Sequence, residues 1–348
     1  MLSYNRVYKK YPGNNFEIKN VSFEAESGSL TAIVGSSGCG KSTLLQLAAA
    51  LELPDKGNVT IEDISAQIAY SKNNIRLGYV FQDASLYPRF TIEDNLLFYH
   101  RVHNIEADLS SSTYEQVCDA FGLVPHLNKL PHQLSGGELQ RAAIARCVLR
   151  QPQVALFDEP LSNLDLENRR IVRKAILEAQ ATQAKSHDAV FIVVMHDDLE
   201  LLEISDKVIL MKDGEIVQDG TFEQIQRHPE SEYCISFFAP FGINSLPIEA
   251  FQNTENTSED NICNYLTNKL SDLNKRLSKV IFRYDALKEI PTGIKININI
   301  ISSEKAGLHR IITGRLPSGF CVQAVVSARY NSSGSALLYI APDDIYLF

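Results

Sequence analysis

Long apolar runs, blocks of basic residues and paired cysteines are all missing from this sequence, and each absence excludes a class of protein. The apolar run Ala189–Met195 is far shorter than the roughly 18 residues that a membrane-spanning helix needs, and Met1–Lys10 lacks the apolar core of a signal peptide. Acidic residues outnumber basic ones by 42 to 33, which argues against a nucleic-acid partner. We therefore expect a chain that stays in the cytoplasm.

The 6 cysteines are scattered along the chain, and no two of them form a C-x-x-C pair. Neither a zinc knuckle nor a disulfide framework is predicted. Hydrophobic residues make up 45% and charged residues 22% of the 348 residues, which is typical of a soluble globular protein. This length favours one large domain with a smaller appendage.

Short apolar runs that alternate with helical stretches predict a mostly parallel α/β sheet in the first two thirds of the chain. The strand-like runs are Leu30–Val34, Val154–Phe157, Val190–Val194 and Val208–Met211, and a long helical stretch covers Glu167–Gln183. Helical signals are denser between Asp83 and Gln151, with helices expected over Asp94–Val102 and Ser112–Phe121. We interpret residues 83–151 as a helical insert in a domain that covers residues 1–238.

The rest of the chain predicts a second, smaller unit. The polar stretch Gln252–Asn261 is typical of a linker, so residues 239–261 are interpreted as the connection. In residues 262–348 the apolar residues from Ile262 to Leu277 have helical spacing, whereas Ile294–Ile301 alternates like a strand. We expect a small, mixed and mainly β appendage.

One motif predicts a phosphate-binding loop. The residues Gly35, Ser36, Ser37, Gly38, Cys39, Gly40, Lys41 and Ser42 match G-x-x-x-x-G-K-[ST]. A predicted strand before the loop and a predicted helix after it favour this interpretation over a flexible glycine linker. Its backbone N–H groups can cradle phosphate oxygens, Lys41 can reach the β and γ phosphates, and Ser42 can bind Mg²⁺. Cys39 is interpreted as a small loop filler rather than a reactive thiol.

Two carboxylates, Asp158 and Glu159, follow the apolar run Val154–Phe157. In a parallel sheet the carboxyl end of a strand is where ligands bind. Asp158 is suited to the Mg²⁺ shell, and Glu159 is suited to polarise an attacking water as general base. An N-cap or a solvated turn is the alternative explanation, which the upstream phosphate loop makes weaker.

A second helix start that can bind an anion is predicted at Ser135. Ser135 and Glu138 have the spacing of a capping box, so a helix should begin at Gly136 and Gly137 with its dipole positive outward. One nucleotide needs two such sites only if they close over it from opposite sides.

With these motifs, the sequence resembles the nucleotide-binding subunits of ABC transporters, whose L-S-G-G-x-x-x-R signature matches Leu134–Arg141. Gln82 matches the family's Q-loop, Asp165 lies in a match to its D-loop, and His196 matches its switch histidine. Tyr11 stands where the family has an aromatic residue that stacks on adenine, although Tyr8 is a rival. A lone histidine after a strand is more often a packing or surface residue, so His196 depends on its place in the set.

The resemblance implies a P-loop ATPase fold of the ABC type with an inserted helical subdomain. It also implies that two copies hold MgATP between them. The site residues that it implies are Glu159, His196 and Gln82 for catalysis; Ser42, Gln82 and Asp158 for the metal; and Tyr11, Gly35, Ser36, Ser37, Gly38, Cys39, Gly40, Lys41, Ser42 and Thr43, with Ser135, Gly136, Gly137 and Asp165, for the nucleotide. The subunit would lie on the cytoplasmic side of the plasma membrane, bound to permease subunits and indirectly to a solute-binding protein, with no nucleic acid.

The stretch Arg76–Asp83 narrows the resemblance to bacterial importers of ferric iron, polyamines, sulfate, molybdate and sugars. We expect import of a small solute or metal ion such as ferric iron. Phe238–Asn244 and Ala341–Ile345 resemble parts of a regulatory β-barrel, but Ala341 replaces the usual Arg and the barrel is expected to be incomplete. Glu138, in place of the commoner Gln, is expected to leave the mechanism unchanged. An exporter motor and a soluble ABC-type ATPase of DNA repair or translation stay as alternatives.

Overall fold

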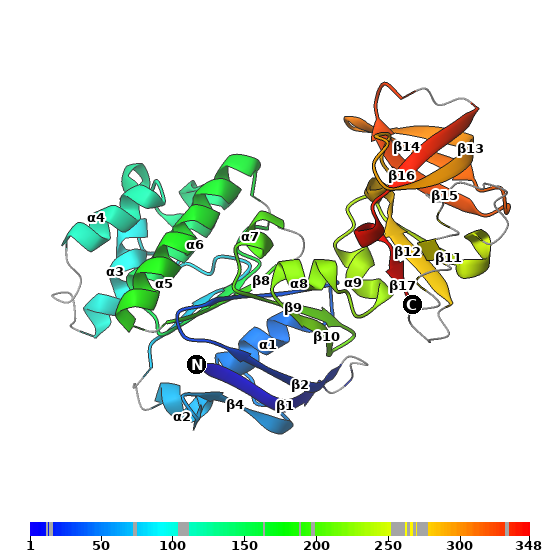
Figure 1. The fold of residues 1–348 in the computed structure, drawn as a ribbon. Coiled ribbons are helices and arrows are strands. Elements are labelled where there is room, and N and C mark those ends of the chain that lie inside the picture. The colour runs from blue at the N-terminus through cyan, green and yellow to red at the C-terminus, as the bar shows by residue number, and fades with distance from the viewer. Residues whose placement is uncertain are drawn as a thin grey trace. The chain divides into compact units, whose positions relative to one another are not determined.

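The structure is a computed structural model that divides the chain into two compact units, residues 1–225 and 226–348 (Figure 1). The residues that it describes are 1–11, 13, 17–71, 75–103, 111–162, 164–187, 189–195, 199–251, 262, 265, 266, 269, 278–330 and 334–348. The boundary falls before the one predicted after residue 238, so residues 226–238 group with the C-terminal unit.

A six-stranded sheet with the order β10-β9-β3-β8-β7-β6 is the centre of the first unit. Its strands are β3 (Leu30–Gly35), β6 (Leu77–Val80), β7 (Val154–Asp158), β8 (Val190–Val194), β9 (Lys207–Lys212) and β10 (Glu215–Gly220). All neighbouring pairs are parallel except β9 with β10. Every residue of β3, β7 and β8 is buried, which is expected of strands covered on both faces. The prediction of a mostly parallel sheet is confirmed.

A second, antiparallel sheet of four strands has the order β2-β1-β4-β5. Its strands are β1 (Leu2–Lys10), β2 (Glu17–Ala25), β4 (Lys56–Ile61) and β5 (Ile64–Ser65). Helix α1 (Lys41–Ala48) shares one hydrophobic core with this sheet and with one face of the central sheet. The helix that follows the phosphate loop is therefore fixed by two sheets.

Four longer helices of the first unit gather beside the central sheet (Figure 1). They are α3 (Ile92–Val102), α4 (Ser111–Ala120), α5 (Gly136–Leu149) and α6 (Leu166–His187). Helix α5 packs against the other three and against β6. The short elements of the first unit are α2 (Ala66–Ser71), η2 (Val124–His126), η3 (Pro131–Gln133) and α7 (Leu199–Glu203). Helix α8 (Phe222–Arg227) spans the boundary between the two units.

The second unit is mainly β, as predicted, and has two antiparallel sheets with the orders β11-β12-β17 and β15-β14-β13-β16. Its strands are β11 (Ile243–Pro247), β12 (Lys279–Arg283), β13 (Ile294–Ala306), β14 (His309–Arg315), β15 (Cys321–Ser327), β16 (Ser335–Ile340) and β17 (Tyr346–Leu347). Its helical elements are α9 (Glu232–Phe237), η4 (Ile248–Phe251), η5 (Tyr284–Ala286) and η6 (Pro342–Asp344). The predicted linker Gln252–Asn261 and most of Ile262–Leu277 lie outside the described residues, but Ile262 and Leu266 are buried in this unit's core.

Candidate nucleotide-binding and hydrolysis site

The predicted phosphate loop connects β3 to α1, and its backbone requires glycine. Gly35 has φ +153, and a Cβ there would lie 2.3 Å from the carbonyl oxygen of Met211. Gly40 is the N-cap of α1 with φ 105, and α1 has neither a side-chain cap nor an acidic residue in its first turn. The first N–H groups of α1 therefore stay available for an anion.

Lys41 is buried, and its ammonium group points back at the loop. Its Nζ donates to the carbonyl oxygens of Gly35 at 2.8 Å and Ser36 at 3.1 Å. An ammonium has three donors, and phosphate oxygens are suitable acceptors for them. This donor set fits a polyphosphate at the loop. Cys39 is buried as well, and this burial raises the pKa of its thiol, which agrees with the loop-filler interpretation.

Ser42 in the first turn of α1 contacts Asp158 at the end of β7, with the Ser42 hydroxyl donating to Oδ1 of Asp158 at 2.9 Å. Asp158 ends β7, and its burial raises the pKa of its carboxyl, against the lowering effects of Ser42 and Lys41. A hydroxyl beside a carboxylate is a set of oxygen ligands that suits Mg²⁺, which commonly takes one or two protein ligands together with phosphate oxygens. The two residues fit the predicted metal role.

Glu159 and Gln82 also come together, with Nε2 of Gln82 donating to Oε2 of Glu159 at 2.9 Å. The backbone of Glu159 is left-handed, with φ 49. Both the N–H and the hydroxyl of Ser162 donate to the Glu159 carbonyl oxygen, at 3.1 and 2.8 Å. A non-glycine residue in this region is strained by about 1–3 kcal/mol, and such strain gathers at functional sites.

The predicted switch histidine, His196, lies outside the described residues. The strand before it is described: β8 ends at Val194, and the N–H of Met195 donates to the Ile33 carbonyl oxygen at 3.1 Å. Because β8 lies between β3 and β7, this strand end is next to both the phosphate loop and the acidic pair.

The second predicted anion site begins α5. Ser135 is its N-cap, and Ser135 and Glu138 form the predicted capping box. Ser135 and Gly136 are exposed. A Cβ on Gly137 would lie 3.2 Å from Nδ2 of Asn168, so this position has little room for a side chain.

Asp165 is exposed and bound within its own turn. The backbone N–H of Asn168 donates to its Oδ1 at 2.8 Å, and the Asn168 side chain donates to its Oδ2 at 2.9 Å. These hydrogen bonds lower the pKa of the Asp165 carboxyl. In this structure Asp165 therefore starts helix α6.

Tyr11 lies beside α1, with its hydroxyl 3.4 Å from Oε1 of Gln46 and the Lys9 ammonium 5.3 Å from its ring centre. Its rival Tyr8 is on β1 and lies under the Lys56 ammonium at 5.9 Å. The contact of Tyr11 with the helix of the phosphate loop favours Tyr11 as the adenine-stacking residue.

Sequence reasoning missed Tyr79, which is on β6 two residues before Phe81 and stacks on its ring at 4.1 Å. Burial is the main cause that raises the pKa of Tyr79, and the charge of Asp158 raises it further. Only the strand register reveals the relationship: Tyr79 pairs with Leu156 on the parallel strand β7, and side chains two residues apart on a strand share a face. Tyr79 and Asp158 are therefore on the same side of the sheet.

Together, the sheet order, the glycine loop and the acidic pair define a P-loop nucleotide-binding fold. The family model of ABC transporters, described as "ABC transporter", matches residues 18–162. The sn-glycerol-3-phosphate import ATP-binding protein of Jannaschia sp. is 31% identical over 344 residues, which cover 98% of this chain and 95% of that protein. The Fe(3+) ions import ATP-binding protein of Rhizobium etli is 36% identical over 255 residues, 73% of this chain and 70% of the relative.

Sulfate import gives a similar match: the sulfate/thiosulfate import ATP-binding protein of Synechocystis sp. is 36% identical over 250 residues, covering 71% of this chain and 67% of that protein. Among solved structures, a dimeric ATP-binding cassette in a post-hydrolysis state with ADP and Pi has a TM-score of 0.54 and 26% identity, covering 64% of this chain and 98% of that one. The chain belongs to the ATP-binding subunits of ABC transporters, and it is an ATPase of the importer group. Among the described residues, no helix is both long and apolar enough to span a membrane.

Proposed function

We propose that two copies of this chain hold MgATP between them and hydrolyse it to drive solute import through membrane-spanning partner subunits. The observation that carries the proposal is the division of the predicted site into two parts. In the first part, Ser42 of the loop contacts Asp158, and Gln82 contacts the neighbouring Glu159. In the second part, Ser135 caps helix α5 and is exposed to solvent. A second copy could supply Ser135, Gly136 and Gly137 to the ATP of the first.

The proposed roles follow from these contacts. The loop Gly35–Thr43 binds the phosphates, with Lys41 turning its ammonium from the loop carbonyls to the nucleotide. Ser42 and Asp158 would hold Mg²⁺, together with Gln82. Bound Mg²⁺ would offset negative charge on the phosphoryl group during transfer.

Glu159 accepts the proton of the attacking water, because its carboxylate is fixed by Gln82 beside the metal ligands. His196 is proposed to orient the γ-phosphate, and Asp165 to lie at the seam between the copies. Release of Pi and ADP removes the ligand that joins the copies, which then separate.

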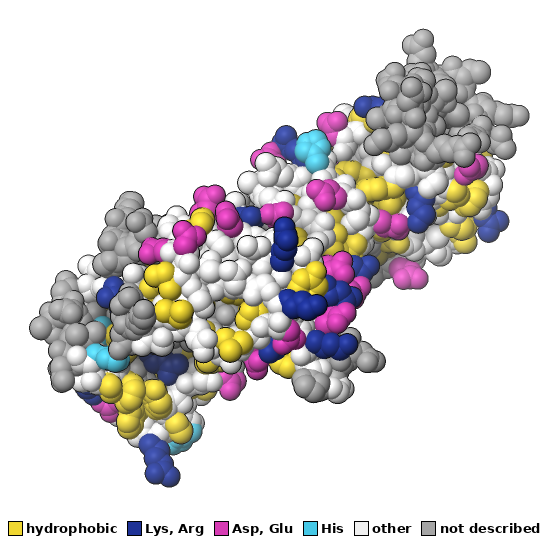
Figure 2. All heavy atoms as spheres, turned by 90° about the horizontal axis from the view of Figure 1, so that it is seen from below, with side chains coloured by type: hydrophobic (Ala, Val, Ile, Leu, Met, Phe, Trp, Pro, Cys, Tyr) yellow, Lys and Arg dark blue, Asp and Glu magenta, His cyan; other side chains and the backbone are white. Residues whose placement is uncertain are grey.

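A groove between β6, α3 and α5 is the proposed docking site for a helix of the membrane partner. It is a cavity of about 340 Å³, and residues that line it include Phe81, Tyr87, Phe98, Tyr99, Arg146 and Arg150. The ring centres of Tyr87 and Phe98 are 4.6 Å apart, and the Arg150 guanidinium lies 4.2 Å from the Tyr99 ring centre. Figure 2 shows hydrophobic side chains gathered on the surface of this helical part, where Tyr87, Phe90 and Val102 are exposed.

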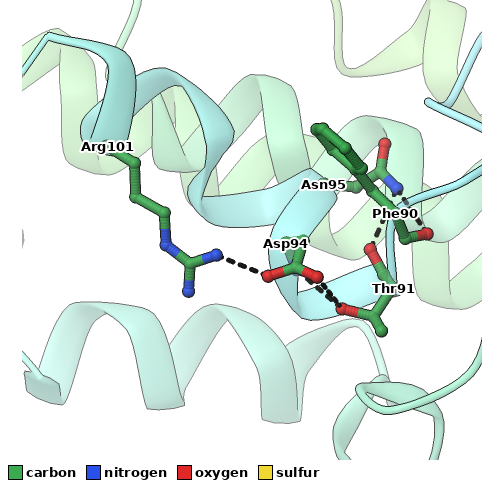
Figure 3. A network of polar contacts seen from close by, with 5 residues as sticks. All are labelled: Phe90, Thr91, Asp94, Asn95 and Arg101. Atoms are coloured by element: carbon green, nitrogen blue, oxygen red, sulfur yellow. Dashed lines mark hydrogen bonds and ion pairs between the residues drawn. The ribbon is translucent and has the colours of Figure 1, made fainter.

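The start of α3, beside this groove, is fixed by a polar network (Figure 3). The Asp94 carboxylate accepts from the Thr91 hydroxyl at 2.8 Å and forms an ion pair with Arg101. The side-chain amide of Asn95 donates to the carbonyl oxygens of Phe90 and Thr91, at 3.2 and 2.9 Å. The network holds Phe90 at the edge of the groove, so the docking surface is preformed.

Sedimentation of the purified chain tests the proposal. The Glu159→Gln variant should be monomeric without nucleotide and dimeric with MgATP, because the ATP that joins the copies is no longer hydrolysed. A variant that binds ATP yet stays monomeric at every concentration would contradict the proposed dimer. Ferric iron stays the predicted solute, and uptake of labelled Fe³⁺, sulfate and spermidine by cells with and without Glu159→Gln would identify it.

A further inference from the structure

A chain of polar contacts connects Lys129 to Ser135 through two intermediate side chains. Lys129 Nζ lies 3.1 Å from Nδ1 of His126, and Nε2 of His126 lies 3.2 Å from Oε1 of Glu138. The other carboxylate oxygen of Glu138 accepts from the backbone N–H of Ser135 at 2.7 Å and from its hydroxyl at 2.8 Å. His126 ends η2 and Lys129 lies in the turn after it, whereas Ser135 is the N-cap of α5 and Glu138 lies in its first turn.

The hydrogen positions in this chain follow from the donors. An ammonium has no acceptor, so Nδ1 of His126 must accept from Lys129. The imidazole then carries its hydrogen on Nε2 and donates it to Glu138. Three donors therefore converge on the Glu138 carboxylate: the Nε2–H of His126, and the N–H and O–H of Ser135.

A carboxylate matches this surrounding and an amide does not. With Gln at position 138, one oxygen could accept from Ser135, but the NH₂ group would then face the Nε2–H of His126, donor against donor. The hydrogen bonds from Ser135, and after them the positive charge of Lys129, lower the pKa of the Glu138 carboxyl, in agreement with an ionised acceptor. Glu138 and His126 are thus chemically matched to each other.

The Ser135 hydroxyl has a single hydrogen, and in this structure Glu138 receives it. Phosphate oxygens at neutral pH are acceptors, so a phosphate contacting Ser135 must take that hydrogen from Glu138. Hydrogen bonds to a charged acceptor are roughly twice as strong as those between neutral groups. The negative charge of Glu138 also opposes the approach of a polyphosphate. The positive charge of Lys129, which contacts the other side of His126, offsets part of this repulsion.

We propose that Glu138, His126 and Lys129 are positioning residues which set how readily Ser135 is released to the ATP phosphate of a second copy. Glu138 restrains closure of the dimer, and His126 and Lys129 moderate that restraint. The inference rests on the proposed sandwich dimer, and it replaces the expectation that Glu in place of Gln has no effect.

The test measures the ATP concentration for half-maximal dimerisation of the full chain in the Glu159→Gln background. Adding Glu138→Gln should lower this concentration by about 3- to 10-fold, because a neutral acceptor gives up the hydroxyl more easily. Adding His126→Ala should raise it by about 3-fold or more, because the carboxylate loses the donor. In the Glu138→Gln background, His126→Ala should have little effect, since it removes a mismatched donor.

His132→Ala is the matched control, because His132 is an exposed histidine in the neighbouring turn η3. It should leave the half-maximal concentration unchanged, and binding of a fluorescent ATP analogue to dilute monomer should be equal in all variants. A structural defect at α5 would weaken dimerisation in both single variants, so the opposite signs distinguish positioning from damage. Equal half-maximal concentrations in the parent, Glu138→Gln and His126→Ala variants would overturn the inference, whereas a parent that never dimerises with ATP would overturn the proposed function itself.

Discussion

The hydroxyl of Ser42 lies 2.9 Å from a carboxylate oxygen of Asp158, although 116 positions separate the two residues in the chain. The contact joins the helix after the phosphate loop to the end of β7, two elements that the parallel strand order brings to the same edge of the sheet. The two residues proposed to bind the metal are therefore held together by the fold itself.

Asp158→Asn tests this pair. The amide keeps the shape and the hydrogen bond to Ser42 but removes the charge that Mg²⁺ needs, so kcat should fall by about 100-fold or more. Steady-state ATPase assays across a Mg²⁺ series should also show a higher half-saturating Mg²⁺ concentration. Asp63→Asn, an exposed aspartate outside the site, is the control, and unchanged Mg²⁺ dependence in Asp158→Asn would exclude the metal role.

Glu159→Gln and Lys41→Ala should separate hydrolysis from binding. Glu159→Gln removes the proposed base but no proposed phosphate contact, so kcat should fall by about 100-fold or more with ATP affinity retained. Lys41→Ala removes a buried cation at the loop, so ATP affinity itself should fall by about 10-fold or more. Equilibrium binding and single-turnover hydrolysis measure the two quantities, and full turnover in Glu159→Gln would remove Glu159 as the base.

Phe90→Ala should weaken coupling to the membrane partner. The side chain is 38% exposed at the edge of the aromatic groove, so its loss removes contact area from the docking surface with little effect on the core. Stimulation of ATPase by the reconstituted permease should fall, while basal ATPase of the isolated chain stays close to normal. Ile68→Ala, at a similarly exposed residue of α2, should leave stimulation intact. Equal stimulation in the two variants would place the docking surface elsewhere.

Asp94→Asn should destabilise the start of α3 in a pH-dependent way. The Thr91 hydroxyl first, and then Arg101, lower the pKa of the Asp94 carboxyl, so its stabilising contribution is present above the unfolded-state pKa of about 3.9 and is lost as the pH falls below it. Because the ion pair with Arg101 is exposed, we expect a loss of about 1 kcal/mol or less at pH 7. Urea unfolding at pH 7 and near pH 3 measures it, and an equal loss at both pH values would contradict the electrostatic explanation.

The strands that carry the site could be predicted from the sequence because they are buried on both faces. Leu30–Val34, Val154–Phe157 and Val190–Val194 are continuous apolar runs, which a buried parallel strand requires. Strand β4 was missed because only Val59 and Ile61 are buried in Lys56–Ile61, so its polar residues resemble a loop. The alternation of an exposed sheet is a weaker signal.

For the candidate site, the sequence indicates the residues but not the contacts between them. The motifs identified Ser42, Asp158, Gln82 and Glu159, yet their pairing depends on strands β6, β7 and β3 that are far apart in the sequence. His126 shows the limit most clearly, since its contact with Glu138 depends on the path of the turns between η2 and α5. The spacing of apolar residues predicts helices and strands, but it does not predict the path of the turns between them.

The left-handed backbone of Glu159 has a consequence for how this protein tolerates change. Asparagine adopts that conformation more readily than glutamate, so Glu159→Asn should relieve local strain while abolishing catalysis. Selection for thermal stability alone would therefore favour a chain that binds ATP without hydrolysing it. At position 159 we therefore expect stability and ATP hydrolysis to favour different residues.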